Sequence, residues 1–404
     1  MNKTINKLLI GSIFLLPLLG VYNEFGYEQI KVLFFILSIS LIGFLWFFQK
    51  PKIIWTKIKI ASWIFILILF LTSILGMDIK VSFLGNQPYF QGWIVYGYLG
   101  LLSLIVSSLD IKLEYYALAF TSSALIVSSL GIEDWVLKNM GFLVPNYAGR
   151  IVSTFGQPNF YAGFLLLNLP FCYFLFKNTR EKLSYFGLIV GLTSIVGIFV
   201  SYSRSTIILA LILLSLGLVD QLKIKLKLGL IVLGIIFISI FIAWKSSSGL
   251  VGNEISNPLL TNNPDLTKES VEKRAYIWPV VWQIFLQKPL GGFGLENIQT
   301  AFSAYFKKYK HPIFEENLNI NPVLISLKEL NIDRTHNYFL DLMLFSGILG
   351  ILGWLIFVLF ILKRCRNKYL LVGLLTYLIW IQFQNQSIVH LIYFYFLIGV
   401  IDKG

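Results

Sequence analysis

The only long polar interval of this 404-residue chain runs from Lys245 to Arg334. It contains the basic pair Lys273-Arg274, the glycine-rich turn Pro289-Leu290-Gly291-Gly292-Phe293-Gly294, the acidic pair Glu315-Glu316 and the adjacent charges Asp333-Arg334. It ends at Thr335-His336-Asn337, where an apolar run begins. Apolar runs fill the sequence before it, as in a protein that crosses a membrane. The arrangement of the fold therefore depends on which side of the membrane this interval occupies.

The composition indicates a membrane protein. Hydrophobic residues make up 57% of the chain and charged residues 13%, with a mean hydropathy of +0.76. A soluble domain carries roughly 25% charged residues. The net charge of +13 would suggest nucleic acid in a soluble protein, but here basic cytoplasmic loops and anionic membrane lipids account for it. We therefore predict one integral membrane domain over residues 1–404, with lipids and not nucleic acid as its surroundings.

Apolar runs of about 17–25 residues predict an all-α polytopic fold. Twelve spans are expected, at 8–22, 30–48, 60–76, 93–109, 114–131, 159–176, 183–201, 205–219, 228–244, 337–362, 369–383 and 388–401. Residues 245–335 then form one large loop between the ninth and tenth spans. No small-residue cleavage site follows the first run before Tyr22, so that run is predicted to remain as a span.

The distribution of basic residues predicts the orientation. With the N-terminus inside, eighteen Lys and Arg residues lie in segments assigned to the cytoplasm, and five lie in short segments assigned outside. Short cytoplasmic loops carry an excess of Lys and Arg in membrane proteins. Both termini are therefore predicted to be inside and the large loop outside.

Polar residues at the start of the sixth span form the first candidate site. The stretch reads Ser153-Thr-Phe-Gly-Gln-Pro-Asn159, and its Gly and Pro predict a turn. Gln157 and Asn159 have amides that can hydrogen-bond a sugar. The alternative is a plain helix start, with Asn159 as the capping residue.

Arg204 is the second candidate. It lies in Ser201-Tyr-Ser-Arg-Ser205, which joins two apolar runs with almost no loop. A guanidinium at the membrane edge is costly unless it reaches water or meets an anion. Either Arg204 grips a phosphate, whose oxygens its fork matches, or it reaches out to lipid headgroups.

The third candidate lies in the large loop, where residues 272–287 have apolar side chains at helical spacing. This segment is predicted to be a helix lying in the outer interface, with Tyr276 and two tryptophans at headgroup level. Arg274 opens it, either as a substrate-binding group or as a plain interfacial charge. Pro279 is expected to interrupt this helix or to set its first turn.

His336 begins the tenth span and is one of three histidines in the chain. A lone histidine is more often structural than catalytic. At a helix N-terminus the dipole favours the neutral imidazole, which can accept a proton. Metal-ligand clusters, a Ser-His-Asp order and a phosphate-binding loop are not evident, so neither a metal nor another cofactor is expected.

Four pieces together resemble the O-antigen ligase/polymerase superfamily. They are Ser153–Asn159 with Ala162, Ser203-Arg204-Ser205, Arg274 through Trp278 and Trp282 to Pro289–Gly294, and His336-Asn337-Tyr-Phe-Leu340 running into Gly347-Ile-Leu-Gly350. The resemblance covers the whole topology, with one large external loop before the tenth span. Gln157 stands where this family more usually has Asn.

The resemblance implies a metal-independent, inverting glycosyltransferase of the GT-C type in the bacterial cytoplasmic membrane. The donor would be a glycan on undecaprenyl diphosphate, and the site would face outward. Arg204 and Arg274 would hold the diphosphate, and His336 would be the catalytic histidine that takes a proton from the acceptor or orients it. Tyr276 and Asn337 join Gln157 and Asn159 as predicted substrate contacts.

The acceptor is left open by the sequence. A ligase would transfer the glycan to lipid A-core or another glycolipid, a polymerase to a second lipid-linked glycan, and a protein oligosaccharyltransferase to a protein hydroxyl. His336-Asn337 and the helix after Arg274 favour the ligase. A transporter of lipid-linked sugars is a different class, for which charges at the bilayer midplane would be expected.

Overall fold

The computed structural model describes residues 2–20, 27–147, 149–222, 277–308 and 332–403. Most of these residues are helical, and the only sheet among them is a hairpin of two strands with two residues each. The elements are α1 (Asn2–Leu15), η1 (Leu16–Leu18), α2 (Tyr27–Phe47), α3 (Lys57–Ile74), α4 (Ile79–Leu84), α5 (Trp93–Ser108), α6 (Leu113–Asn139), β1 (Asn146–Tyr147), β2 (Arg150–Ile151), η2 (Ser153–Phe155), α7 (Pro158–Asn178), α8 (Glu181–Val200), α9 (Arg204–Leu222), α12 (Ile298–Lys308), α15 (Tyr338–Arg364), α16 (Lys368–Trp380) and α17 (Ile388–Lys403).

Every predicted span except the ninth has a described helix at its place, and the ninth, 228–244, lies outside the described residues. The first helix begins at Asn2, six residues before the predicted start. Six of the described helices, α2, α3, α6, α7, α8 and α15, are long and apolar enough to cross a membrane. The prediction of an all-α membrane protein is confirmed, whereas the count of twelve spans and the large loop stay predictions.

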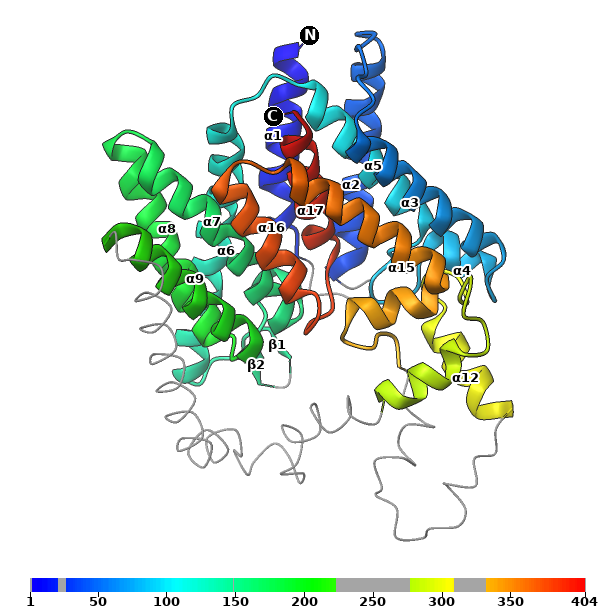
Figure 1. Cartoon of the computed structure of the whole chain (residues 1–404). Coiled ribbons are helices and arrows are strands. Elements are labelled where there is room, and N and C mark those ends of the chain that lie inside the picture. Colours follow the sequence, from blue (N-terminus) through cyan, green and yellow to red (C-terminus); the bar gives the residue numbers. More distant parts are fainter. Residues whose placement is uncertain (1, 21–26, 148, 223–276, 309–331, 404) are drawn as a thin grey trace.

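The helix α17 lies at the centre of the bundle (Figure 1). Almost all of its side chains are buried, from Ile388 to Asp402. A helix that is apolar on all sides is stable only when other helices surround it. It packs against α5, while α7 packs against α8 and α16, and α15 packs against α3.

Outer helices present apolar side chains outward. Leu37 and Phe47 of α2, Leu75 at the end of α3 and Leu192 of α8 are all more than half exposed. In a soluble protein such faces would be a liability. In a multi-pass membrane protein they are the surface that contacts lipid.

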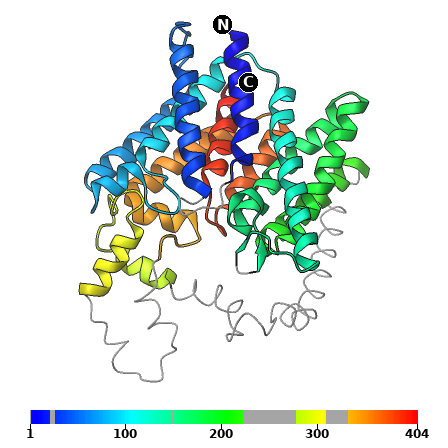
Figure 2. The ribbon, with the colours of Figure 1, turned by 180° about the vertical axis from the view of Figure 1, so that it is seen from behind.

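Both termini lie at one end of the bundle (Figures 1 and 2). The opposite end carries the β1–β2 hairpin, α12 and the starts of α9 and α15, and we call it the hairpin end. Two chain ends on the same side agree with the predicted orientation of the termini.

The helix α15 is broken at Gly347, where the backbone has φ 62° and ψ −156°. The break frees backbone groups that cannot be left unpaired in apolar surroundings. The turn Pro289–Gly294 pairs with them: Phe293 N donates to Leu344 O at 2.7 Å, Gly294 N to Phe345 O at 2.9 Å, and Ile348 N to Pro289 O at 2.8 Å. The break and the turn therefore form one hydrogen-bonded junction.

Glycine is required on both sides of this junction. A Cβ on Gly347 would lie 2.4 Å from Leu290 O, and one on Gly292 would lie 2.6 Å from Leu344 O. Both residues have positive φ, 62° and 65°, which side chains disfavour. The junction therefore gives a physical reason for glycine at both Gly292 and Gly347.

We predict that Gly347→Ala destabilises the protein by at least about 1–3 kcal/mol, because its backbone conformation is nearly exclusive to glycine. Thermal unfolding in detergent measures this. The control is Gly97→Ala in α5, where nothing lies within 4 Å of the new Cβ and a helical alanine should add about 0.5–1 kcal/mol. Equal unfolding temperatures for the two variants would show that the junction does not need the glycine.

Candidate functional site

The first motif forms a tight turn at the hairpin end. Ser153–Phe155 is one turn of 3₁₀ helix, Gly156 is left-handed at φ 69°, and α7 then begins at Pro158. A Cβ on Gly156 would lie 2.0 Å from the ring of Tyr27, so this turn also needs glycine. The predicted turn is confirmed.

The turn rests on a buried lysine. Lys31 is fully buried in α2, where its Nζ donates to the carbonyl of Thr154 at 2.7 Å and lies 4.4 Å from the ring centroid of Phe155. Lys31 is one of the five basic residues that the sequence assigned to short outside segments, and this assignment is wrong because Lys31 lies buried within α2. A buried ammonium is tolerated here because the carbonyl, the ring and Glu28 one helical turn earlier all stabilise its charge.

Gln157 and Asn159 have different surroundings. Gln157 is the N-cap residue of α7, although its side chain does not bond to the helix. Its buried Oε1 has no hydrogen-bond partner within the described residues. Asn159 lies within the first turn of α7 and is not the cap, so the alternative that made it the capping residue is wrong.

The amide oxygen of Asn159 joins two elements. It accepts hydrogen bonds from Ser203 Oγ at 2.9 Å and from Arg150 Nη2 at 3.2 Å. Ser203 directly precedes Arg204, the exposed first residue of α9. Two of the predicted motifs, around Asn159 and Arg204, therefore meet in space.

His336 lies two residues before the first residue of α15. Its φ of 60° is left-handed, a conformation that ordinary residues adopt only where neighbouring contacts impose it, and often at functional sites. Asn337 is the N-cap of α15, since its Oδ1 accepts from Leu340 N at 3.1 Å. Its Nδ2 donates to Gln382 O at 3.2 Å. Asn337 thus has a structural role, and its contact with substrate stays a prediction.

Residues on both sides of His336 are held in place. Thr335 N donates to Asp341 Oδ1 at 2.8 Å. The carbonyl of Thr335 accepts from Trp278 Nε1 at 3.1 Å. Trp278 belongs to the helical residues 277–285, which form part of the interfacial helix predicted from the sequence. This helix therefore contacts the segment that carries His336.

A buried ion pair fixes the same segment. Arg334, with a side chain 5% exposed, pairs with Glu296, which is 3% exposed. Its guanidinium also lies 4.5 Å from the ring centroid of Tyr89 and 5.1 Å from that of Phe345. Burial raises the pKa of Glu296, against the opposing effect of Arg334. Burial lowers the pKa of Arg334, but Glu296 and Asp341 outweigh this and hold it above its usual value.

The segment between α16 and α17 connects the start of α9 with the start of α15. Gln384 Nε2 donates to Ser205 Oγ at 2.7 Å, beside Arg204. Gln382 O accepts from Asn337, and Tyr338 N donates to Ile381 O at 3.1 Å, beside His336. We call residues 381–387 the bridging segment. The sequence signal for it was the run of amides Gln382-Phe-Gln-Asn-Gln386 between two apolar spans, which the sequence analysis did not single out.

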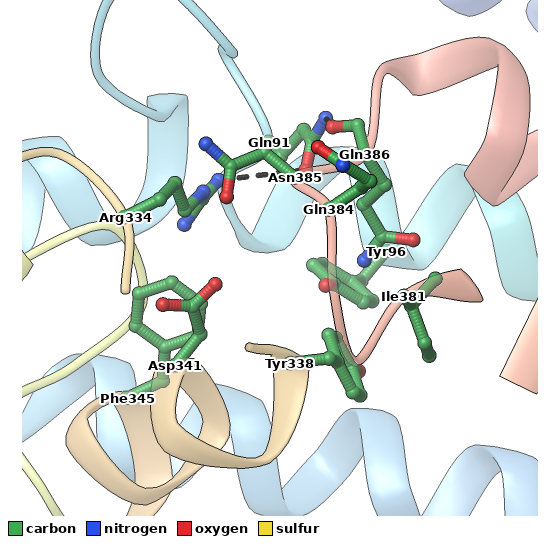
Figure 3. Close-up of a pocket in the computed structure, with 10 residues that line it drawn as sticks. All are labelled: Gln91, Tyr96, Arg334, Tyr338, Asp341, Phe345, Ile381, Gln384, Asn385 and Gln386. Carbon is green, nitrogen blue, oxygen red and sulfur yellow. Dashed lines mark hydrogen bonds between the residues drawn. The ribbon is translucent and has the colours of Figure 1, made fainter. Parts of the chain in front are cut away.

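A small polar cavity lies against the bridging segment (Figure 3). Its lining residues include Gln91, Arg334, Asp341, Gln384 and Asn385. The free space of about 10 Å³ is enough for one water molecule. A sugar does not fit inside it.

The predicted site residues fall into two groups. Arg204, Gln157, Asn159, His336 and Asn337 all belong to elements of the hairpin end, linked by the bridging segment. Arg274 and Tyr276 lie outside the described residues. In the described part of the chain, no group of three His, Cys, Asp or Glu side chains is placed to hold a metal ion.

The fold and the site define an all-α, multi-pass membrane protein with a polar, arginine-containing site at one end of its bundle. Residues 189–355 match the family model described as O-antigen ligase. This stretch runs from α8 through Arg204 and His336 into α15, and over it the chain is similar to the O-antigen ligase family. The resemblance drawn from the sequence is confirmed, and with it an enzyme of the ligase or polymerase type. No curated protein matched the chain.

We predict that Glu296→Gln lowers stability by about 3–5 kcal/mol, because it leaves a buried Arg334 without its charge partner. The matched control is Asp220→Asn. Asp220 pairs with Lys368 at 3.0 Å, but these side chains are 42% and 59% exposed, so its loss should cost no more than about 1 kcal/mol. Thermal unfolding of both variants in detergent is the measurement, and a similar loss in both would contradict the role assigned to Glu296.

Proposed function

We propose that the chain transfers a glycan from an undecaprenyl diphosphate carrier to a surface acceptor such as lipid A-core, by metal-independent inverting transfer. One observation carries the proposal: the bridging segment ties the start of α9, with Arg204, to the start of α15, with His336. A cationic group and a histidine at one membrane edge are what transfer from a lipid diphosphate requires.

The reaction needs two kinds of help. A new bond forms between the acceptor oxygen and the anomeric carbon, while the bond from that carbon to the diphosphate oxygen breaks. The diphosphate leaves with the electron pair, and its growing negative charge is stabilised by Arg204 and Arg274. The acceptor hydroxyl gives its proton to His336, which arginine cannot replace because it does not deprotonate.

The surroundings of His336 support this assignment. Its backbone is left-handed, and the residues on either side of it are held by the Glu296–Arg334 pair and by the N-cap contact of Asn337. A fixed backbone restricts the positions open to the imidazole, and precise placement favours proton transfer. Trp278, four residues after Arg274 in the sequence, contacts Thr335, which supports a shared site for Arg274 and His336.

The alternatives differ in the acceptor or in the class of protein. Polymerisation of lipid-linked glycans and transfer to protein hydroxyls use the same donor chemistry. A transporter of lipid-linked sugars is less well supported, because Arg204, Arg150 and the Glu296–Arg334 pair all belong to the hairpin end. The test of acceptor class is to supply purified donor with lipid A-core, with a second lipid-linked glycan or with protein, and to compare the products.

We predict that His336→Asn binds the lipid-linked donor but does not transfer the glycan, because the amide cannot act as a base near neutral pH. The measurement is transfer from purified donor in detergent or proteoliposomes, with donor binding followed separately. His311→Asn, the same change elsewhere in the polar interval, is the control and should transfer at the wild-type rate. Near-wild-type transfer by His336→Asn would remove His336 from the catalytic role.

We predict that the hairpin end faces outward from a bacterial cytoplasmic membrane. Leu143, fully exposed at this end, should react as Leu143→Cys with an impermeant thiol reagent on intact spheroplasts. Arg180→Cys, exposed between α7 and α8, should react only after permeabilisation. Both changes are made in a Cys365→Ser background. The reverse labelling pattern would overturn the orientation and the extracytoplasmic site.

A further inference from the structure

Arg150 lies outside the motifs that were singled out from the sequence. It begins β2 and pairs with Tyr147 across the two-stranded hairpin, so its backbone is fixed. From there its Nε donates to Ser201 O at 3.0 Å, and its Nη2 donates to Asn159 Oδ1 at 3.2 Å. The guanidinium therefore lies between the start of α7 and the turn that leads to Arg204.

The charges around Arg150 are unusual. Burial and the neighbouring Arg204 both lower the pKa of Arg150, to about 10. No carboxylate of the described residues forms an ion pair with Arg150. Its hydrogen bonds in this part of the chain go to neutral oxygens, and its Nη1 donates to none of them. The positive charge of Arg204 therefore opposes that of Arg150, whose guanidinium is largely desolvated.

Two buried cations of the described residues, Lys59 and Arg334, are stabilised by carboxylates. Lys59 pairs with Asp402 at 2.7 Å and Arg334 pairs with Glu296. Buried charges are normally paired in this way. Arg150 has amide and carbonyl contacts that orient it, but no carboxylate of the described residues neutralises its charge. An anion that binds beside Arg150 and Arg204 would offset their repulsion and would accept a hydrogen bond from Arg150 Nη1.

We propose that Arg150 is a further binding residue for the diphosphate group of the donor, acting together with Arg204. This inference rests on the proposed function and adds to it a residue from a different element of the fold. Two guanidinium forks match the several oxygens of a diphosphate better than one. Asn159 is then a positioning residue, which holds Arg150 and Ser203 through one amide oxygen.

The test compares donor affinity with turnover. Arg150→Gln should raise the KM for the lipid-linked donor by at least about tenfold, because a charge-assisted hydrogen bond is lost. Arg150→Lys should lie between this variant and the wild type, since it keeps the charge but not the fork. Asn159→Asp should also raise the KM, because the new carboxylate pairs with Arg150 and competes with the anion.

The control is Lys138→Gln. Lys138 is an exposed cation whose ammonium donates to the carbonyl of Gly149 in the same hairpin, so this variant tests for loss of hairpin structure or of general positive charge. Its KM should equal that of the wild type. An Arg150→Gln enzyme with a donor KM within about twofold of the wild type would overturn the inference while leaving the proposed function intact.

A binding experiment separates the sources of phosphate. Inorganic pyrophosphate should raise the unfolding temperature of the purified wild type, and Arg150→Gln should abolish this shift. Equal shifts in both proteins would overturn the inference even if the wild type failed to transfer glycan. If Arg150→Gln instead changed only the dependence on phosphatidylglycerol in vesicles, the residue would bind a lipid headgroup and the inference would be wrong.

Discussion

The hydrogen bonds between the break in α15 and the turn Pro289–Gly294 are the constraint on which the site depends. They fix the turn against Gly347, and Glu296 follows two residues after the turn. Glu296 pairs with Arg334, which lies two residues before His336. Asn337, directly after His336, is the N-cap residue of α15. The start of α15 and the break in its middle are therefore both held by one short segment, residues 289–296.

These contacts explain why a break is tolerated within the apolar helix α15. A broken helix in lipid would expose unpaired amides and carbonyls, and each would cost several kcal/mol. The turn supplies partners from the main chain and not from side chains, so close approach is necessary. Close approach is possible only where Cβ atoms are absent, as at Gly292 and Gly347.

A second network organises the arginines. Asn159 holds Arg150 and Ser203, Ser203 precedes Arg204, and Gln384 holds Ser205 from the bridging segment. The bridging segment also contacts Asn337 beside His336. The two networks meet there, so the positions of the cationic groups and of the imidazole depend on one another. Precise relative placement of this kind is what stabilisation of a leaving diphosphate demands.

Charge alone does not distinguish structural from functional groups in this protein. Lys31 and Arg334 are more deeply buried than Arg204, yet their contacts are with Thr154, Phe155 and Glu296 of the chain itself. The sequence shows all of them only as basic residues near apolar runs. Their neighbours in space, which come from other elements, show that Lys31 and Arg334 hold the fold.

The sequence by itself determined the helices, because apolar runs of membrane length leave few other structures for the backbone. It also predicted candidate site residues, since Arg204, Asn159 and His336 each lie at the start of a predicted span, where polar side chains are unusual, and their roles stay predictions. Only the tertiary structure decided that Asn159 serves Arg150, that Lys31 is buried, and that Gln384 joins two helix starts. These contacts join residues from about 9 to 179 positions apart, and helical periodicity describes only neighbours within a few residues.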